Sequence, residues 1–561
     1  MAFIEVSNLK YRYPHTKTLA LDGINLSIEK GEFIGIAGEN KAGKSTLCQS
    51  FAGLIPTMFK GAYGGKILIG KKNAAETPIA ELCQSVGLVF QNPFNQLSGA
   101  KETVFDEIAF GLQNLGVPRE EMIKRVRDNL KLLDIEKYAY RNPFDLSGGQ
   151  IQRVAIASIL AMNPELIVLD EPTSQLDPQG SEEVFKAVEK LTKSGITIIM
   201  AEHKIEKLAS YCDKILLLHK GKQIAFDTPE YIFSRDDLDS IGVLPPVYTQ
   251  VCKTLSISKK SEKDKIIYPV TFQDVEKLKG FFPEHLVGRI TSSEDDSIVK
   301  NPVFQIEHLS FSYNPMVSVI EDVNLTFRNE PTAIIGQNGA GKTTLVKLLK
   351  GLIKPASGSI LFERNDTKNQ TVAQLSAQIG YVFQNPDDQI FKNKVMDEIM
   401  VGPLNLGWSK TKAKESARGA LEMVGLIDKA EQNPYDLDLS ERKLIAVASV
   451  IAMNPKVLIL DEPTIAQDVK GKEIIGKLIT SLFARGKLII TILHDMDFAA
   501  KYFNRIIVMA HGKILADGPK EEVFYRTNTL KQAHLEQPHV TSLCRELGYE
   551  GVFLDTDDLN A

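Results

Sequence analysis

The stretch GENKAGKS, Gly38 to Ser45, decides how this chain folds. It follows the apolar run FIGIA and precedes the helical run TLCQSFAGL. It matches the pattern G-x-x-x-x-G-K-[ST], in which a glycine-rich loop joins a strand to a helix. Backbone N–H groups of such a loop close around phosphate oxygens, and the N-terminus of the following helix adds partial positive charge. The stretch therefore predicts a phosphate site in an α/β fold.

The same pattern occurs again as GQNGAGKT, Gly336 to Thr343, after the run TAIIG. Other landmarks repeat at a constant offset: Asp170 and Asp461 are 291 residues apart (461 − 170), and so are His203 and His494 (494 − 203). A constant offset indicates two copies of one domain. We place the copies at residues 1–235 and 303–530, a linker or extension with little core of its own at 236–302, and a C-terminal tail at 531–561.

Length and composition narrow the class of protein. The 561 residues are too many for one hydrophobic core. The chain is 43% apolar and 24% charged with a net charge of −5, which is typical of globular proteins and disfavours a large nucleic-acid surface. We expect no membrane span and no signal peptide, since no apolar run is long enough. Five scattered cysteines without a C-x-x-C pair predict buried thiols in a reducing compartment rather than a zinc or iron–sulfur site.

Short apolar runs alternate with helical stretches in each copy. The runs LIVLD, ITIIMAEH and KILLLH of the first copy indicate buried strands of a mostly parallel sheet. The stretch EMIKRVRDNLKLL places Met122, Val126, Leu130 and Leu133 on one helical face. This spacing predicts a helical insert between residues of about 100 and 145.

Two carboxylates follow a buried strand in each copy, at Asp170-Glu171 and at Asp461-Glu462. We expect the aspartate to suit Mg²⁺ and the glutamate to polarise an attacking water. An acidic strand-to-turn junction without a catalytic role is the alternative. Lysines 44 and 342 would reach the terminal phosphates, and the hydroxyls of residues 45 and 343 would ligate Mg²⁺.

Further polar residues follow neighbouring strands. Gln91 and Gln384 precede the helical insert of their copies. His203 and His494 lie at the end of the next apolar strand after the two carboxylates of their copies. A histidine at such a strand end can hydrogen-bond a γ-phosphate, although a single histidine is often structural. Tyr13 and Tyr313 would stack on an adenine ring, or they belong to the core of an early strand.

In this order the motifs resemble the nucleotide-binding domain of ABC transporters, over nearly all of both copies. The resemblance implies ATP and Mg²⁺ as cofactors, ATP hydrolysis, and an antiparallel β subdomain beside each parallel sheet. It implies the catalytic residues Glu171, His203, Glu462 and His494, and the metal ligands Ser45, Gln91, Asp170, Thr343, Gln384 and Asp461. The implied ATP-binding residues are Tyr13, Gly38, Asn40, Gly43, Lys44, Ser45, Thr46, Ser147, Gly148, Gly149, Gln150, Tyr313, Gly336, Asn338, Gly339, Gly341, Lys342, Thr343 and Thr344.

More narrowly, VFQNPFNQLSGAKETVFDEIAFGLQNLG and VFQNPDDQIFKNKVMDEI resemble the ATPases of energy-coupling factor (ECF) transporters. GLIPTMFKGAYGGKILI is similar to the fused, two-domain members of that group. The resemblance implies a peripheral location on the cytoplasmic face of the membrane, with a membrane T component and a substrate-binding S component as partners. It implies import of a micronutrient: a vitamin, a precursor or a metal. Asp387 and Asp388 would pair with an arginine of the T component; a solvated acidic turn is the alternative.

The second copy lacks a match to the signature LSGGQ, residues 146–150 of the first copy. Constant offset aligns Asp438, Leu439, Ser440 and Glu441 with the residues from Ser147 to Gln150. In ABC proteins the two domains pair head to tail, and each signature contacts ATP held by the opposite domain. We therefore expect the site completed by residues 437–441 to be degenerate, and the site completed by residues 146–150 to hydrolyse ATP.

Two further departures accompany this one. The D-loop reads SQLD at 174–177 but IAQD at 465–468, and Lys41 stands where the second copy has Gly339. The D-loop change affects the same degenerate site. The rival function, a soluble tandem ABC protein acting on the ribosome, would want a long charged helical linker and basic surfaces. The prolines of LPPV and YPV and the negative net charge favour transport.

Overall fold

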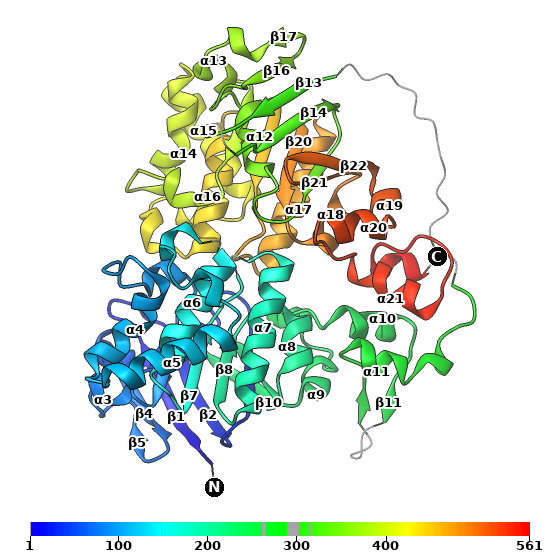
Figure 1. Ribbon diagram of the computed structural model, residues 1–561. Helices are drawn as coiled ribbons and strands as arrows, with labels where there is room; N and C mark the ends of the chain where they lie inside the picture. The colour runs from blue at the N-terminus through cyan, green and yellow to red at the C-terminus, as the bar shows by residue number, and fades with distance from the viewer. Residues whose placement is uncertain are drawn as a thin grey trace. The chain divides into compact units, whose positions relative to one another are not determined.

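The computed structural model describes residues 2–146, 148–174, 176–260, 265–286, 288, 302–314 and 317–560. Of residue 560 it describes the backbone alone. The chain forms two compact units, Met1–Phe282 and Pro283–Ala561 (Figure 1). Each is described by itself below.

A six-stranded sheet forms the centre of the first unit, in the order β10-β9-β3-β8-β7-β6. The strands are β3 Phe33–Ala37, β6 Val86–Val89, β7 Leu166–Asp170, β8 Thr197–Ala201, β9 Lys214–His219 and β10 Lys222–Asp227. All neighbours pair in parallel except β9 and β10. Every residue of β3, β7 and β8 is buried, which explains their continuous apolar runs.

Layers cover both faces of this sheet. One face packs against α1 Lys44–Phe51 and an antiparallel sheet in the order β2-β1-β4-β5. The opposite face packs against α4 Val104–Asn114, α5 Arg119–Leu132, α6 Gly148–Ala161 and α7 Pro178–Lys193. The antiparallel strands are β1 Ile4–Arg12, β2 Leu21–Ile28, β4 Ala62–Ile69 and β5 Lys72–Asn73. The predicted fold, with its antiparallel subdomain and helical insert, is confirmed.

Between residues 236 and 282 the described residues, which leave out 261–264, are folded as part of the first unit. This stretch contains α10 Val247–Thr254, a two-stranded ladder of β11 Lys259–Lys260 and β12 Ile266–Ile267, and α11 Phe272–Glu276. Ile241, Val243 and Val270 join the helical core of the first unit. The structure thus differs from the expectation of little core, because scattered apolar residues of this stretch find partners that are distant in sequence. Residues 287 and 289–301 of the expected linker lie outside the described residues.

The second unit repeats this plan. Its central sheet has the order β18-β19-β20-β15-β21-β22, and its antiparallel sheet the order β14-β13-β16-β17. The central strands are β15 Thr332–Ile335, β18 Ile379–Val382, β19 Val457–Asp461, β20 Leu488–Leu493, β21 Arg505–Ala510 and β22 Lys513–Pro519. The others are β13 Phe304–Phe311, β14 Ile320–Phe327, β16 Ser357–Phe362 and β17 Asn365–Asp366. Its helices include α12 Lys342–Leu349, α14 Val395–Asn405, α15 Lys410–Met423, α16 Leu439–Ile451, α17 Val469–Ala484 and α18 Met496–Tyr502.

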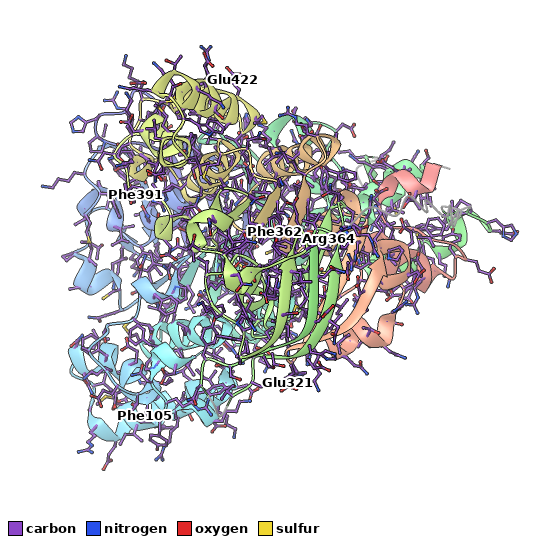
Figure 2. The ribbon with its side chains drawn as sticks, turned by 90° about the horizontal axis from the view of Figure 1, so that it is seen from above. Phe105, Glu321, Phe362, Arg364, Phe391 and Glu422 are labelled. Atoms are coloured by element: carbon purple, nitrogen blue, oxygen red, sulfur yellow. The ribbon has the colours of Figure 1, made fainter. Side chains whose placement is uncertain are left out.

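Figure 2 labels Phe362 and Arg364 at the antiparallel sheet of this unit, and Phe391 and Glu422 at its helical part.

The tail beyond residue 530 is folded onto the second unit. It contains α21 His539–Leu547, and Leu535 and Leu554 enter the helical core. Across the described ranges, no helix combines the length and the hydropathy that a membrane span requires.

Candidate active site

The loop from Gly38 to Gly43 joins β3 to α1 and surrounds the amine of Lys44. Lys44 Nζ donates to the carbonyl oxygens of Gly38 at 3.1 Å and Glu39 at 3.2 Å. Gly43 has a left-handed φ of 104°, and a Cβ there would lie 2.6 Å from Ala20 O. Glycine is therefore required at this position. The lysine amine and the free N–H groups of the first turn of α1 form a cationic cradle suited to phosphate.

Lys41 and Gly339 share one backbone conformation. Their φ angles are 63° and 80°, both in the left-handed region. A lysine there costs about 1–2 kcal/mol relative to the right-handed region. The loop thus keeps its shape in the first unit even though the glycine is missing.

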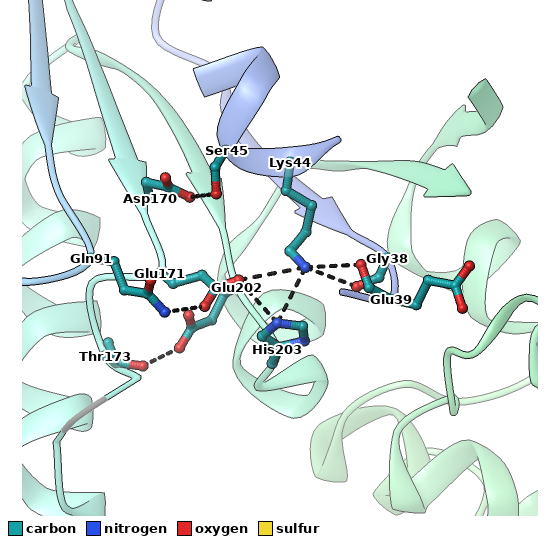
Figure 3. A network of polar contacts seen from close by, with 10 residues as sticks. All are labelled: Gly38, Glu39, Lys44, Ser45, Gln91, Asp170, Glu171, Thr173, Glu202 and His203. Atoms are coloured by element: carbon teal, nitrogen blue, oxygen red, sulfur yellow. Dashed lines mark hydrogen bonds and ion pairs between the residues drawn. The ribbon is translucent and has the colours of Figure 1, made fainter. Parts of the chain in front are cut away.

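The buried carboxylate of Glu171 lies at the centre of a polar network (Figure 3). Its Oε2 accepts from Gln91 Nε2 at 2.7 Å, and its Oε1 lies 3.0 Å from His203 Nε2 and 3.5 Å from Lys44 Nζ. Glu171 has a φ of 48°, a strained conformation typical of functional sites. The structure thus brings four predicted site residues together around one carboxylate.

The neighbouring Asp170 accepts a hydrogen bond from Ser45 Oγ at 3.0 Å. Burial raises the pKa of Asp170 to about 7, and the charge of Glu171 adds to this effect. Burial also acts to raise the pKa of Glu171, but His203 and Lys44 outweigh it and lower that pKa to about 2. A buried carboxyl with a raised pKa next to a hydroxyl gains from a bound cation. Hydroxyl, carboxylate and amide oxygens are also the donor set that Mg²⁺ takes, so these residues fit the ion.

The second unit builds the same arrangement. Lys342 Nζ donates to the carbonyl oxygens of Gly336 at 2.6 Å and Gln337 at 2.9 Å. Thr343 Oγ1 donates to Asp461 Oδ1 at 3.4 Å. The pKa of Asp461 is raised, first by burial and then by the adjacent glutamate.

Glu462 is the counterpart of Glu171. Its carboxylate accepts from Gln384 Nε2 at 2.7 Å and lies 2.8 Å from His494 Nε2. Burial acts to raise the pKa of Glu462, but the contacts to His494 and Lys342 outweigh it and lower that pKa. Both units therefore hold a charged glutamate ready to polarise a water.

Two residues of the second site were missed by the sequence interpretation. The Tyr381 hydroxyl donates to Asp461 Oδ2 at 2.9 Å, and Lys443 Nζ donates to Glu462 O at 2.9 Å. The first copy has Leu88 and Gln152 at the matching positions. The contrast between LVFQNP and YVFQNP was the signal for Tyr381, since a polar ring in a buried strand needs a partner.

The two predicted adenine-stacking tyrosines lie in unlike surroundings. The Tyr13 hydroxyl lies 3.2 Å from Thr46 Oγ1 of α1 and its ring meets Tyr11 edge-on. Tyr313 is 60% exposed and meets Phe311 edge-on. Adenine stacking stays a prediction for both. The other predicted residues lie in the phosphate loops and first helical turns: Asn40, Asn338, Gly341 and Thr344.

The first signature lies at the start of α6, which begins at Gly148. A Cβ added to Gly149 would lie 3.5 Å from Gly180 Cα and 3.9 Å from a Leu176 methyl, so the backbones approach closely here. Gln150 Nε2 donates to the Tyr138 hydroxyl at 3.1 Å. Ser147 and Gln175 lie outside the described residues.

The matching helix of the second unit, α16, caps its own N-terminus. The Asp438 side chain accepts from Glu441 N at 2.8 Å, and the Glu441 side chain accepts from Asp438 N at 3.4 Å. This reciprocal capping box satisfies N–H groups that a helix N-terminus otherwise leaves free. In α16 the two carboxylates therefore cap N–H groups that would otherwise be available to bind an anion.

The second D-loop has changed together with the signature. Ser440 Oγ donates to Gln467 Oε1 at 2.7 Å, and Gln467 Nε2 donates to Ser440 O at 3.1 Å. Both side chains are buried. In the first unit the matching pair is Gly149 and Leu176. The second unit thus has a hydrogen-bonded polar pair where the first unit has two residues without polar side-chain atoms.

Known proteins with similar sequences span both units. The family model described as ABC transporter matches residues 21–174 and 320–465. An ABC transporter ATP-binding protein of Methanosarcina acetivorans is 37% identical over 98% of this chain and 91% of its own length. One of Caldanaerobacter subterraneus is 38% identical over 99% of this chain and 98% of its own length.

Among solved structures, cbiO1 of Clostridium perfringens, part of the ABC transporter complex cbiONQ, is 31% identical. The match covers 44% of this chain and 99% of that chain with a TM-score of 0.39. The full-length sequence relatives and the two family matches carry the assignment, together with the two phosphate loops and their carboxylate networks. The chain belongs to the ABC transporter family and is an ATP-hydrolysing transport ATPase with two ABC transporter domains.

Proposed function

We propose that this ATPase energises an ECF-type importer of a micronutrient and hydrolyses ATP mainly at one of two unequal sites. The head-to-tail pairing behind this proposal comes from the resemblance of the motifs to ABC domains. Site one then combines the phosphate loop 38–45 with residues 437–441, and site two combines the phosphate loop 336–343 with residues 146–150.

The capping box of α16 carries the asymmetry. Donors at a helix N-terminus bind a phosphate oxygen only when they are free and uncrowded by negative charge. Asp438 and Glu441 use two of these donors and add two carboxylates, and Leu439 adds a branched side chain. Each charge-assisted hydrogen bond lost to the γ-phosphate is worth about 1.5–3 kcal/mol. Site one therefore binds ATP through its phosphate loop and turns over slowly.

At site two the chain supplies a complete set of groups. Glu462 accepts the proton of an attacking water, and the amide of Gln384 and the imidazole of His494 hold its carboxylate in place. The Lys342 amine, which donates to the carbonyl oxygens of Gly336 and Gln337, would neutralise charge on the terminal phosphates. The signature glycines Gly148 and Gly149 lack side chains and so permit close approach of the backbone.

Mg²⁺ would be held by the same residue types in both units. These are Ser45, Gln91 and Asp170 in the first and Thr343, Gln384 and Asp461 in the second. The amide nitrogens of both glutamines are committed to Glu171 and Glu462, so their carbonyl oxygens are the atoms a cation would use. The ion supplies charge neutralisation between the phosphates.

We further propose that Asp387 and Asp388 bind an arginine of a membrane T component, with an S component supplying the substrate site. Asp387 Oδ1 lies 3.3 Å from Arg442 Nε, and the Asp387 side chain is 43% exposed. An incoming arginine would compete with Arg442 for this carboxylate. Arg442 directly follows the capping box, so the contact links docking to the second signature.

The test is to purify the full chain from membranes and identify what accompanies it. The proposal expects a small multi-span membrane protein with the wild type and its loss with Asp387→Ala/Asp388→Ala. The control Asp322→Ala removes another exposed acid, one paired with His308 on the antiparallel sheet, and should keep the partner. Sedimentation with ribosomes, or equal recovery with both variants, would contradict the proposal.

A further inference from the structure

The second unit has a cavity of about 410 Å³ that lies away from its phosphate loop. It opens between α15, the end of α16, the start of β19 and the end of α17. Leu458 lines it, whereas Asp461 ends the same strand about 10 Å further along. This volume falls in the range of small-molecule sites, about 300–1,000 Å³.

The cavity has an apolar floor and a charged rim. Ala420, Met423, Ile451 and Leu482 contribute to the floor. Trp408, Lys412, Glu415, Arg485 and Lys487 stand around it. Lys412 Nζ lies 4.2 Å from the centre of the Trp408 ring, so the indole face already attracts a cation.

Arg485 and Lys487 form a pair of cations on one side of the cavity. Among the residues that the structure describes, no carboxylate lies within 4.0 Å of either. Lys487 Nζ donates to Asn454 O at 3.2 Å and Asn454 Oδ1 at 2.8 Å, and both acceptors are uncharged. Burial lowers the pKa of Lys487, and the adjacent Arg485 lowers it further. A bound anion would stabilise the charged forms of Arg485 and Lys487, because no carboxylate pairs with either side chain.

The first unit serves as an internal comparison, because α5 and α15 match residue for residue along the repeat. Arg125 Nη1 donates to Ala161 O, and at the matching positions the small Ser416 Oγ donates to Ala452 O. The first unit thus places a guanidinium group where the second has only a hydroxyl. The smaller side chain of Ser416 leaves more room at this place, where it lines the cavity.

Other residues that line the cavity also differ from their matches in the first unit. Gly419 stands where the first unit has Asp128, and outside its own helix no heavy atom of the described residues lies within 4 Å of an added Cβ. Ser194 and Ile196 are replaced by Arg485 and Lys487. All four exchanged residues, Ser416, Gly419, Arg485 and Lys487, line the cavity, so its lining differs in size and charge from the matching residues of the first unit.

We propose that this cavity binds a small planar aromatic anion, with its ring over the apolar floor beside Trp408 and its acid group at Arg485 and Lys487. The floor favours an aromatic or aliphatic ring over a bare inorganic anion. Glu415 also lines the cavity and disfavours a polyanion such as a nucleotide, because each further negative charge of the ligand adds repulsion. One carboxylate or sulfonate on a ring satisfies both conditions.

Trp408 is the single tryptophan of the chain, so tryptophan-sensitised emission of a dye reports this cavity. The experiment titrates the full chain with 8-anilinonaphthalene-1-sulfonate and, separately, with N-phenyl-1-naphthylamine, the same ring system without the sulfonate. The wild type should give saturable sensitised emission with the sulfonate. Arg485→Ser/Lys487→Ile should raise the Kd of the sulfonate by at least about tenfold and change that of the neutral dye less than about twofold.

The second variant, Ser416→Arg/Gly419→Asp, restores the residues of the first unit and should abolish sensitised binding of both dyes. All four substituted residues come from matching positions of the first unit, and unchanged ATP binding shows that the variants fold. Equal Kd values for the sulfonate in the wild type and both variants, or equal weakening of both dyes by charge removal, would overturn the proposal.

Discussion

Ser440 and Gln467 are joined by two hydrogen bonds, one from the serine hydroxyl to the amide oxygen and one from the amide nitrogen back to the serine carbonyl. The residues belong to the two motifs of the second copy that depart from the first. Their matching residues, Gly149 and Leu176, cannot form these hydrogen bonds, because glycine has no side chain and leucine has no polar side-chain atom. The two departures are therefore one structural change, and the second signature is a packed feature of its unit rather than a decayed one.

The pair predicts coupled effects on stability. Ser440→Gly or Gln467→Leu alone leaves a buried polar group without its partner and should destabilise the second unit by about 1–3 kcal/mol. The double variant Ser440→Gly/Gln467→Leu, which recreates the pair of the first unit, should lose less than the sum. Trp408 fluorescence follows unfolding of the second unit in denaturant, since the chain has no other tryptophan. Additive losses would show that the two residues are energetically independent.

Substitutions at residues 41 and 339, which match in the two phosphate loops, should change the stability of their units in opposite directions. Lys41→Gly removes a lysine from a left-handed conformation and should stabilise the first unit, whereas Gly339→Lys should destabilise the second by about 1 kcal/mol. Apart from its chain neighbours, no heavy atom of the described residues lies within 4 Å of a Cβ at Gly339, so the effect is conformational rather than steric. Unfolding followed by Trp408 measures the second variant. A Gly339→Lys protein as stable as the wild type would mean that the backbone carries no strain there.

Lys443 predicts a pH dependence. Burial lowers the pKa of Lys443 to about 8, below its ordinary 10.5, although Glu462 and Asp461 act to raise it. Between these values the unfolded chain binds more protons at this residue than the folded one, so stability rises with pH, by up to about 1.4 kcal/mol per unit. Lys443→Gln, the residue of the first copy, should reduce the rise between pH 8 and 10 in Trp408-monitored unfolding. Identical slopes in the two proteins would refute a depressed pKa.

Grafting the first signature onto the second predicts a gain of function. Asp438→Ser, Leu439→Gly, Ser440→Gly and Glu441→Gln, made together with Gln467→Leu, remove the capping box and restore glycines at the start of α16. In a Glu462→Gln background the remaining ATP turnover comes from site one. We expect the graft to raise that turnover by about tenfold or more, since it restores charge-assisted contacts to the γ-phosphate. If the graft folds and leaves the turnover rate unchanged, the altered signature is not the cause of slow turnover at site one.

Much of the fold could be predicted from the sequence because its signals are local. The loops at Gly38 and Gly336 and the buried strands before Asp170 and Asp461 need only neighbouring residues to be recognised. The folded stretch up to Phe282 could not be predicted in this way, since Ile241 and Val270 are buried by residues far along the chain. Long-range contacts leave no short-range pattern.

The site shows a similar division. The networks around Glu171 and Glu462 follow from strand order, because parallel strands end at one edge of a sheet. The D-x-x-E spacing of Asp438 and Glu441 is a local capping signal, but the sequence interpretation treated these residues only as part of a degenerate signature. The structure shows that both side chains cap the N-terminus of α16. Tyr381 and Lys443 were missed because a single polar residue in an apolar run shows no partner until the sheet is assembled.

The most direct test of the unequal sites compares ATP turnover of Glu462→Gln and Glu171→Gln in the full chain with its membrane partners. Both substitutions keep the size of the side chain and remove the carboxylate that polarises the water, so each reports its own site. Loss of a general base costs about 10²- to 10⁴-fold at the site that uses it. We predict near-complete loss of turnover with Glu462→Gln and a much smaller loss with Glu171→Gln. Equal losses from the two substitutions would contradict the account.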